Sequence, residues 1–440
     1  MGKGDCGDQR LASEYKAGYI PWELIQTHRT AESRWIVIDG CVYDVTKWSK
    51  KHPGGARIIG GFAGQDATDA WYAMHDKKEY VSKFMKPLLV GRVSPDEKQK
   101  TESELVMDFR ELRHQVENMG LFRVNPWFFI GHLFQVLFLE VLAYVILCYY
   151  GVGWTPYLTA VILLVIAQAQ AGWTQHDYGH LSVFSSSRVN HIMHHFVIGI
   201  LKGASSHWWN FRHFLHHVKP NAIGKDPDIN TAHLFLLGEN LPKQWGEKKR
   251  GNLPYHWQHR YFWIVGVPLL LPVYFHLENI YFVFRRRNLL DFTIAVAFFT
   301  RLFYFYGPLL GGMGAFKFYM FIRLLESFWF VFVTQMNHIP MEIDKDQEVD
   351  WVTSQLKSTC NVDPSWFNDW FTGHLNFQIE HHLFPTMPRH NYIHVMPLVK
   401  SLCKKHHLNY VSKPMGTAMA DILRSLHRSG DIWYKAYYQL

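Results

Sequence analysis

The chain has 440 residues, of which 48% are hydrophobic and 16% aromatic, yet its mean hydropathy is only -0.12. Such an average arises when long apolar segments are diluted by polar ones, which predicts membrane spans beside a soluble domain. The net charge of +8 fits cytosolic loops and anionic lipid surfaces, and the sequence contains no recognisable nucleic-acid-binding module. Nucleic acid is therefore excluded as a partner, and the lipid bilayer is expected as one.

Residues 1–17 are polar and contain no apolar stretch, so we predict a disordered N-terminus that is not a cleavable signal peptide and stays in the cytosol. The five cysteines lie far apart and include no CxxC pair, which predicts reduced thiols and no disulfide framework. Both features favour soluble parts that face the cytosol.

Residues 18–94 have the pattern of a small α+β domain. The runs RWIVIDG and CVYDV predict two strands joined by a turn at Asp39 and Gly40. The motif HPGG begins at His52, and His75 follows in WYAMH, so two histidines are available as axial ligands of a haem. The segment resembles cytochrome b5, which implies haem b held by His52 and His75. A haem with two histidine ligands has no open position, so we expect electron transfer and not oxygen binding.

Residues 95–122 are predicted to connect this domain to the rest of the chain. The run PDEKQKTESE, at 95–104, contains no large apolar side chain and reads as a linker. Apolar residues then recur at helical spacing from Leu105 to Met119, which predicts an amphipathic helix. We expect this helix to pack on the following domain, with a position on the bilayer surface as the alternative.

Residues 123–440 are predicted to form a membrane domain of the all-α class, with four transmembrane helices and a cytosolic helical cap. Its polar parts, residues 181–260 and the region after His338, are expected to form the cap. The apolar segments lie at 127–150, 154–173, 261–284 and 289–338, and the first two have aromatic residues at their ends.

The last apolar segment, 289–338, is too long for one crossing and could make two. The three histidine clusters described below must lie on one side of the membrane to act together, which requires an even number of crossings between the second and the third. If 261–284 spans, only one half of the last segment can, and we expect 315–335 to span and the other half to be interfacial or luminal. Both termini are then cytosolic, but the arginines at 285–287 lie on the luminal side, against the positive-inside rule.

Three histidine clusters, HDYGH, HFLHH and QIEHH, stand out in the membrane domain. In a helix, residues three or four positions apart share a face, so each cluster can direct its imidazoles to one point. Imidazole is a ligand for Fe, Zn, Cu or Ni, and seven converging imidazoles exceed the coordination number of one ion, so we expect two metal ions. The histidines are His176, His180, His213, His216, His217, His381 and His382.

The third cluster lies on a helix that is predicted to begin near Asp363 and to end near Leu383. Gln378 occupies a position where another histidine would complete the cluster, and its amide oxygen can bind iron or hold a water molecule. One face of the predicted helix carries His374, Gln378, His381 and His382.

The three clusters, placed around paired apolar spans and behind a b5-like domain, resemble the membrane front-end fatty acid desaturases. The runs TQMNH and HLNFQIEHHLFPTMPRH are similar to the vertebrate-type delta-6 and delta-5 members. The resemblance implies two non-haem iron ions and O2 as co-substrate. It also implies that a polyunsaturated fatty acyl-CoA gains a cis double bond on the carboxyl side of an existing one. Electrons from NADH would arrive through cytochrome b5 reductase and the haem, at the endoplasmic reticulum membrane.

The resemblance also implies which residues carry the chemistry. A further ligand is expected after the last span, at His338. Gln378 is the residue that front-end members carry, and His374 is a candidate to bind metal directly or to lie just outside the ligands. The implied catalytic and metal-binding residues are His176, His180, His213, His216, His217, His338, Gln378, His381 and His382.

Other functions stay open at this point. A sphingolipid long-chain-base desaturase or a fatty acyl hydroxylase can use the same kind of iron site with a b5-type donor. A membrane-tethered b5 electron carrier whose histidines only bind metal is the non-enzymatic alternative. Zinc proteolysis is not supported, because the sequence lacks His-Glu-x-x-His. A carboxylate-bridged di-iron site in a helix bundle would need two Glu-x-x-His pairs, and only Glu111 and His114 have that spacing.

Overall fold

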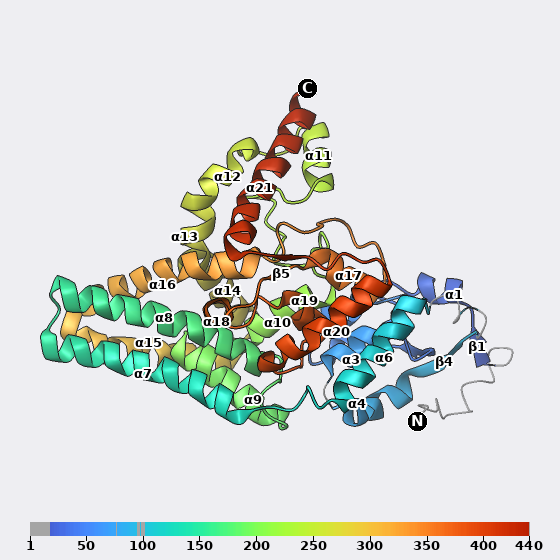
Figure 1. Cartoon of the computed structure of the whole chain (residues 1–440), viewed down its shortest axis with the longest axis horizontal. Helices are drawn as coiled ribbons and strands as arrows, with labels where there is room; N and C mark the ends of the chain where they lie inside the picture. Colours follow the sequence, from blue (N-terminus) through green and yellow to red (C-terminus); the bar gives the residue numbers. More distant parts are fainter. Residues whose placement is uncertain (1–17, 76, 95–96, 98–101, 440) are drawn as a thin grey trace.

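The computed structural model describes residues 18–75, 77–94, 97 and 102–439. The N-terminus that is predicted to be disordered, residues 1–17, lies outside these ranges, as does most of the predicted linker. A small domain with a β-sheet lies at one end of the molecule and a bundle of long helices at the other, with shorter helices between them (Figure 1).

The N-terminal domain is α+β, as predicted. Its strands form one sheet in the order β1-β4-β3-β2, with β2 antiparallel to β3 and β1 parallel to β4. Asp39 and Gly40 both have positive φ, 52° and 72°, which the tight turn between β2 and β3 requires. The elements are β1 (Tyr19–Ile20), α1 (Trp22–Thr27), β2 (Trp35–Ile38), β3 (Cys41–Asp44), η2 (Trp48–Lys50), α2 (Ala56–Gly60), α3 (Thr68–Met74), α4 (Lys78–Met85), η3 (Lys86–Leu88) and β4 (Leu89–Val93).

The cysteines follow the prediction of reduced thiols only in part. Cys148, Cys360 and Cys403 are free. Cys41, in β3, is disulfide-bonded. Spacing along the chain does not reveal which segments the fold brings together, so this bond could not be predicted from the cysteine pattern.

The predicted amphipathic helix is α6 (Glu104–Asn118), and it packs on the following domain as expected. The helix begins after Ser103, whose hydroxyl caps it by accepting a backbone N–H hydrogen bond. Arg110 of α6 pairs with Asp69 of α3 at 2.9 Å, so the helix also contacts the N-terminal domain. Its apolar face is buried in a core shared with α17 (Trp351–Ser358), α19 (Gln378–Leu383) and α20 (Tyr392–Lys405).

Four long helices lie along one another in the membrane domain (Figure 1). The turn 151–153 joins the first two and Gly311 alone joins the last two, so each pair is an antiparallel hairpin. The outer surface is apolar, since Phe134 and Val141 of the first helix are 66% and 61% exposed. Such a surface suits contact with lipid. The helices are α7 (Pro126–Tyr150), α8 (Trp154–Gly179), α15 (Leu289–Leu310) and α16 (Gly312–Gln335).

The expectation that one half of 289–338 is interfacial or luminal stays a prediction. Both halves form long helices, because Gly311 at φ 72° closes a hairpin with a single residue. Within the described residues, four helical stretches are long and apolar enough to cross a membrane, namely α7, α8, Tyr255–Arg286 and α15. Helix α16 is not one of them, and it carries three charged residues.

The stretch Tyr255–Arg286 is not a regular helix. Pro268 and Pro272 lack the N–H that a helix interior needs, and π-helical turns lie beside or around them. The stretch runs across the long axis of the bundle and not along it (Figure 1). Its elements are η5 (Tyr255–Trp257), α12 (Gln258–Tyr261), η6 (Phe262–Gly266), α13 (Val267–Leu269), η7 (Leu270–Phe275) and α14 (His276–Arg286).

The remaining elements form the helical cap that the sequence predicts; most of them lie at the end of the bundle that faces the N-terminal domain, and the C-terminal helix extends away from both (Figure 1). The short strands β5 and β6 pair in parallel within it. The cap contains α9 (Ser187–His194), η4 (His195–Leu201), α10 (Ser206–Val218), α11 (Asn240–Glu247), β5 (Asn361–Val362), α18 (Trp366–Thr372), η8 (Arg389–Asn391), β6 (Ser412–Lys413) and α21 (Met415–Tyr438), together with α17, α19 and α20.

Candidate metal centre

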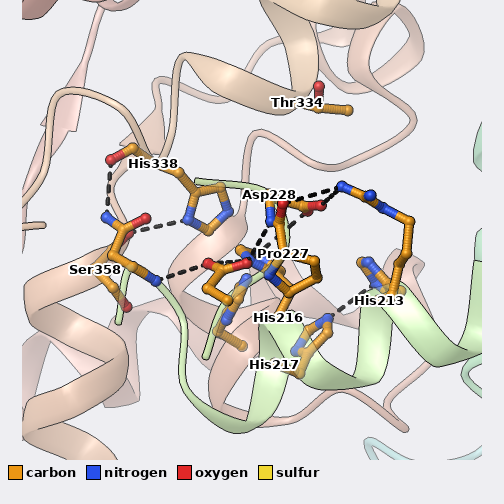
Figure 2. Close-up of polar contacts among 12 residues, drawn as sticks. His213, His216, His217, Pro227, Asp228, Thr334, His338 and Ser358 are labelled. Atoms are coloured by element: carbon orange, nitrogen blue, oxygen red, sulfur yellow. Dashed lines mark hydrogen bonds and ion pairs between the residues drawn. The ribbon is translucent and has the colours of Figure 1, made fainter. Parts of the chain in front are cut away.

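Eight predicted ligand histidines converge where α8 ends, between α10, α19 and the segment after α16. They form two groups, and within each group the ligand atoms lie within 4.8 Å of one another. Helix α10 contributes to both groups, because its three histidines lie on adjoining faces (Figure 2). The first group is His176, His180, His213, His217 and His381, and the second is His216, His338 and His382.

In the first group the imidazole nitrogens approach one another closely. Nε2 of His213 lies 2.7 Å from Nε2 of His180 and 3.0 Å from Nε2 of His217. The Nε2 atoms of His176 and His381 are buried and have no hydrogen-bond partner in the described part of the chain. Buried polar atoms without a partner are costly, so this donor set fits a metal ion that all five rings would bind.

The second group contains the predicted glutamine as well. Nε2 of the Gln378 amide lies 3.1 Å from Nε2 of His338, and Oε1 of Gln378 is buried without a partner in the described residues. Turning the amide over would direct the oxygen to the same point, and both imidazole and amide oxygen are iron ligands. The group therefore fits a second ion with three imidazoles and one amide.

Hydrogen bonds on the Nδ1 side fix the orientation of four rings. When Nδ1 is held in this way, Nε2 points toward the centre of the group, as in most histidine metal sites. The Nδ1 contacts are His216 to Asp226 at 2.9 Å, His338 to the carbonyl of Ser358 at 3.0 Å, His381 to the Tyr392 hydroxyl at 3.0 Å, and His382 to Oε1 of Gln355 at 2.9 Å.

Burial keeps most of these imidazoles neutral, which is the form that binds metal. Burial, aided by the neighbouring histidines, lowers the pKa of His217 and of His382 well below the ordinary value, and it lowers the pKa of His338 to about 3. His216 differs: burial opposes its protonation, but the carboxylates of Asp226 and Asp228 raise its pKa above the ordinary value. This ring is the most basic ligand of the second group.

The prediction of one continuous helix over 363–383 is wrong. Helix α18 ends before Gly373, and Gly373 and His374 have the left-handed φ values 59° and 64°, so α19 begins only at Gln378. The break rotates His374 away from the other predicted ligands. It belongs to neither histidine group, and its ring centroid lies 5.5 Å from that of Phe128 on α7.

In the N-terminal domain, the two predicted haem ligands face each other. The ring centroids of His52 and His75 lie 6.2 Å apart. Nδ1 of His75 lies 2.9 Å from the carbonyl oxygen of Trp71, which leaves its Nε2 for another ligand. Burial, together with His75, lowers the pKa of His52 to about 4. Two neutral imidazoles on opposed segments fit the axial positions of a haem.

The N-terminal domain packs directly on α10, the helix that supplies three of the metal-centre histidines. Ile58 of α2 is buried with Leu215 and Val218 of α10. Phe214 packs against the same cluster, and its ring centroid lies 5.9 Å from that of His180. One aromatic side chain thus contacts both the domain with the two opposed histidines and the metal centre.

Comparisons with known proteins agree with this architecture. Residues 152–414 match the family model described as "Fatty acid desaturase". The chain is also 50% identical over 421 residues, 95% of each chain, to Fatty acid desaturase 3 of Bos taurus. The chain belongs to the fatty acid desaturase family.

The desaturase has a cytochrome b5-like domain at its N-terminus. Residues 21–94 match the model described as "Cytochrome b5-like Heme/Steroid binding domain". Among solved structures, the cytochrome b5 of Ostreococcus tauri virus 2 is 36% identical and covers 17% of this chain and 94% of its own, with a TM-score of 0.16. The family match and the opposed pair His52 and His75 together imply a haem.

Sequence reasoning missed the residues that orient the ligands of this desaturase. Gln355 and Tyr392 contact His382 and His381, but neither stands at a regular spacing from them. Asp226 is different, because the run Asp-Pro-Asp that it begins follows the second histidine cluster closely. Acidic residues just after a metal-binding cluster were a signal that could have found it.

Proposed function

We propose that this desaturase introduces a cis double bond into polyunsaturated fatty acyl-CoA, on the carboxyl side of an existing double bond, with O2 as co-substrate. The observation that carries the proposal is the combination of two adjoining histidine groups at the end of an apolar helix bundle with a b5-like domain on α10. An electron-transfer domain beside a two-metal site suits an oxidation that needs electrons.

The two histidine groups would each hold one non-haem iron, the second with Gln378 as its additional ligand. When bound, the two irons would supply the activation of O2, which takes one hydrogen from each of two adjacent methylenes and, with two electrons and two protons, leaves as two water molecules. The protein residues hold this site in place. Asp226, Gln355 and Tyr392 fix ring orientations, and the burial of the imidazoles excludes water that would compete for the ligand positions.

The electrons would come from NADH through cytochrome b5 reductase to a haem between His52 and His75. Covalent fusion gives the donor a high effective concentration at its acceptor, because the two are never separated by diffusion. The contact of Ile58 with Leu215 supports a fixed docking position, and Phe214 fills the space between the docked domain and His180.

For the membrane we propose the endoplasmic reticulum, with both termini cytosolic and α7, α8, α15 and α16 as the four crossings. The stretch Tyr255–Arg286 would then lie in the membrane interface. Its helix α14 exposes Leu277 and Phe284, by 64% and 65%, which suits an amphipathic helix on a bilayer. The arginines at 285–287 then stay on the cytosolic side, which obeys the positive-inside rule.

The proposal is tested by expressing the protein in a host without such an activity, feeding defined polyunsaturated acids and locating new double bonds by mass spectrometry. The expected product is two hydrogens lighter, with a new cis double bond nearer the carboxyl group than any other. His216→Ala should give no product at equal haem content, whereas His233→Ala, an exposed histidine outside both groups, should behave as wild type. Hydroxylated acids, or products confined to long-chain bases, would contradict the proposal.

A further inference from the structure

A third group of potential metal ligands lies outside the two histidine groups. It consists of His195 at the start of η4, His207 near the start of α10 and Asp291 near the start of α15, and its three ligand atoms lie within 4.8 Å of one another. His207 stands six residues before His213 on α10, which is about 9 Å along a helix that rises about 1.5 Å per residue. The group is therefore separate from the metal centre, and the proposed function does not use it.

Asp291 is a buried carboxylate without a lysine or arginine beside it. The residue is only 2% exposed, and among the described residues its charged or potentially charged partners are both histidines. Nδ1 of His207 lies 3.0 Å from Oδ2, and Nδ1 of His195 lies 3.9 Å from Oδ1. The Ser205 hydroxyl donates to Oδ2 at 2.5 Å. Buried charges in proteins are paired or coordinate a metal ion, so this carboxylate requires a cation.

Helix capping does not account for this arrangement. Asp291 lies in the first turn of α15, where the helix dipole favours a negative charge, and its backbone N–H donates to the side chain of Asn288. An acidic residue that only capped α15 would reach back to the backbone at the start of its own helix. The carboxylate of Asp291 instead contacts Ser205 and His207, at the start of α10. It therefore serves a contact between elements that are far apart in the sequence.

The spacing of the three ligand atoms fits one tetrahedral ion. Imidazole nitrogen and carboxylate oxygen bind Zn²⁺ at about 2.0 to 2.2 Å, which puts two ligand atoms of a tetrahedral site about 3.4 Å apart. The observed separations from Asp291, 3.0 Å for His207 and 3.9 Å for His195, lie on either side of this value. Two imidazoles, one carboxylate and a water molecule form a known type of open zinc site. The side chain of His207 is 48% exposed, so water can reach the fourth position.

We propose that His195, His207 and Asp291 bind one Zn²⁺ ion at the junction of η4, α10 and α15. The ion would join the start of α10, the helix that carries three metal-centre histidines, to the start of the α15 and α16 hairpin. Because metal binding stabilises the fold that assembles its ligands, the ion would hold α10 in place from outside the histidine groups. This inference goes beyond the proposed function and does not depend on it.

His207→Ala tests the site, because this half-exposed ring can be removed without opening a buried cavity. Zn²⁺ binding is measured on the full-length, detergent-solubilised holoenzyme by equilibrium dialysis, with zinc and iron counted by mass spectrometry. The wild type should bind one Zn²⁺ per chain at unchanged iron content, and the variant should bind it at least about tenfold more weakly. Asp291→Asn keeps an oxygen for the Ser205 hydroxyl but loses the charge, and it should show the same loss.

His233→Ala is the matched control, because it removes an exposed histidine that belongs to none of the ligand groups, and it should bind Zn²⁺ like the wild type. Zn²⁺ should also raise the unfolding temperature of the wild type and of this control, but not that of the two site variants, since only a ligand bound to the folded state stabilises it.

Equal Zn²⁺ affinity in the wild type and in both site variants, at normal haem content, would overturn the site. Zinc uptake that only replaces iron would place the ion in the histidine groups and would overturn it as well. A wild type that binds no Zn²⁺ would leave protonated His207, whose pKa the hydrogen bond to Asp291 raises, as the counter-ion of the buried carboxylate, and the metal site would be ruled out.

Discussion

Gln378 is the member of the proposed metal centre that is not a histidine, and its contact with His338 gives it a testable role. Gln378→Ala removes the amide beside Nε2 of His338, so the second ion would lose one of four ligands. We expect activity to fall by about 10- to 100-fold and the non-haem iron content to fall from two toward one per chain. Gln378→His offers an imidazole with a different reach, and partial activity is expected. Product formation and metal content are the measurements.

The activity and iron content of the variants have to be compared with those of the wild type at equal expression and equal haem content, because a general folding defect would lower activity and iron content together. If Gln378→Ala turns over at a nearly normal rate with both irons bound, the amide only fills a polar gap between α19 and the segment that carries His338.

His52 and His75 allow the haem to be separated from the iron site. In the wild type the two rings face each other across 6.2 Å in a domain that is distinct from the histidine groups of the bundle. His52→Ala or His75→Ala should therefore abolish the haem absorbance and the desaturation but leave the non-haem iron in place. A normal haem spectrum in both variants would rule out these two residues as the axial ligands.

Among the helices, α10 has two roles, since it carries three histidines on one side and receives the N-terminal domain on the other. Gly61, just after α2, is packed so closely that an added Cβ would lie 2.9 Å from Cγ1 of Val218 on α10. Gly61→Leu should push the domain away from α10 while its own backbone, at φ -62°, tolerates the side chain. We expect a normal haem spectrum but re-oxidation of the haem, during substrate turnover, that is slower by at least about tenfold, because misplacement of the donor weakens its coupling.

Gly416→Leu is a suitable control for this variant, because a Cβ at Gly416 meets no other atom within 4 Å. Stopped-flow spectroscopy measures the rate at which the reduced haem is re-oxidised, which should be slower in Gly61→Leu than in Gly416→Leu. Equal rates in Gly61→Leu and in the wild type would show that electron delivery does not depend on this packing.

How far the sequence predicts each element depends on whether the signal is local. The pair His176 and His180, one turn apart, could be read directly because the helix period brings both to one face. The break at Gly373 is a mixed case. A glycine that ends a helix in the left-handed conformation is a local signal, but the close approach that excludes a side chain there, with a Cβ position 2.3 Å from Cβ of Trp173, is a tertiary contact that the sequence does not show. By spacing alone, His374 and Gln378 fit one helix face, which makes His374 a candidate ligand.

At the scale of the whole molecule, three features lie in a row. The N-terminal domain contacts α10, the histidine groups lie beside α10, and an apolar cavity lies deeper between α7, α8, α15 and α16. Under the proposed function, electrons would reach the histidine groups from the N-terminal domain on one side, with the apolar cavity on the other side. This order requires every histidine cluster to lie at the same membrane surface.

The decisive test of the topology is the side of the membrane on which residues 285–288 lie. This loop is cytosolic in one possible arrangement of the crossings and luminal in the other. If Tyr255–Arg286 lies in the interface, the hairpin of α15 and α16 makes both crossings between the second and third clusters, and this loop is cytosolic. If the stretch crosses, the same loop is luminal. Glycosylation tags inserted after Arg287, at Gly311 and at Val152 should therefore be modified at Gly311 and Val152 but not at Arg287.

Each tagged variant must keep its haem spectrum, so that a misfolded protein is not scored. Modification after Arg287 would mean that Tyr255–Arg286 spans the membrane, as its length and apolar composition allow. In that case α15 and α16 could not both cross, because His216 and His382 would then lie on opposite sides of the bilayer. Their ring centroids lie 5.0 Å apart, so only one of the two helices could then cross, and this result would contradict the proposed topology but leave the shared metal centre standing.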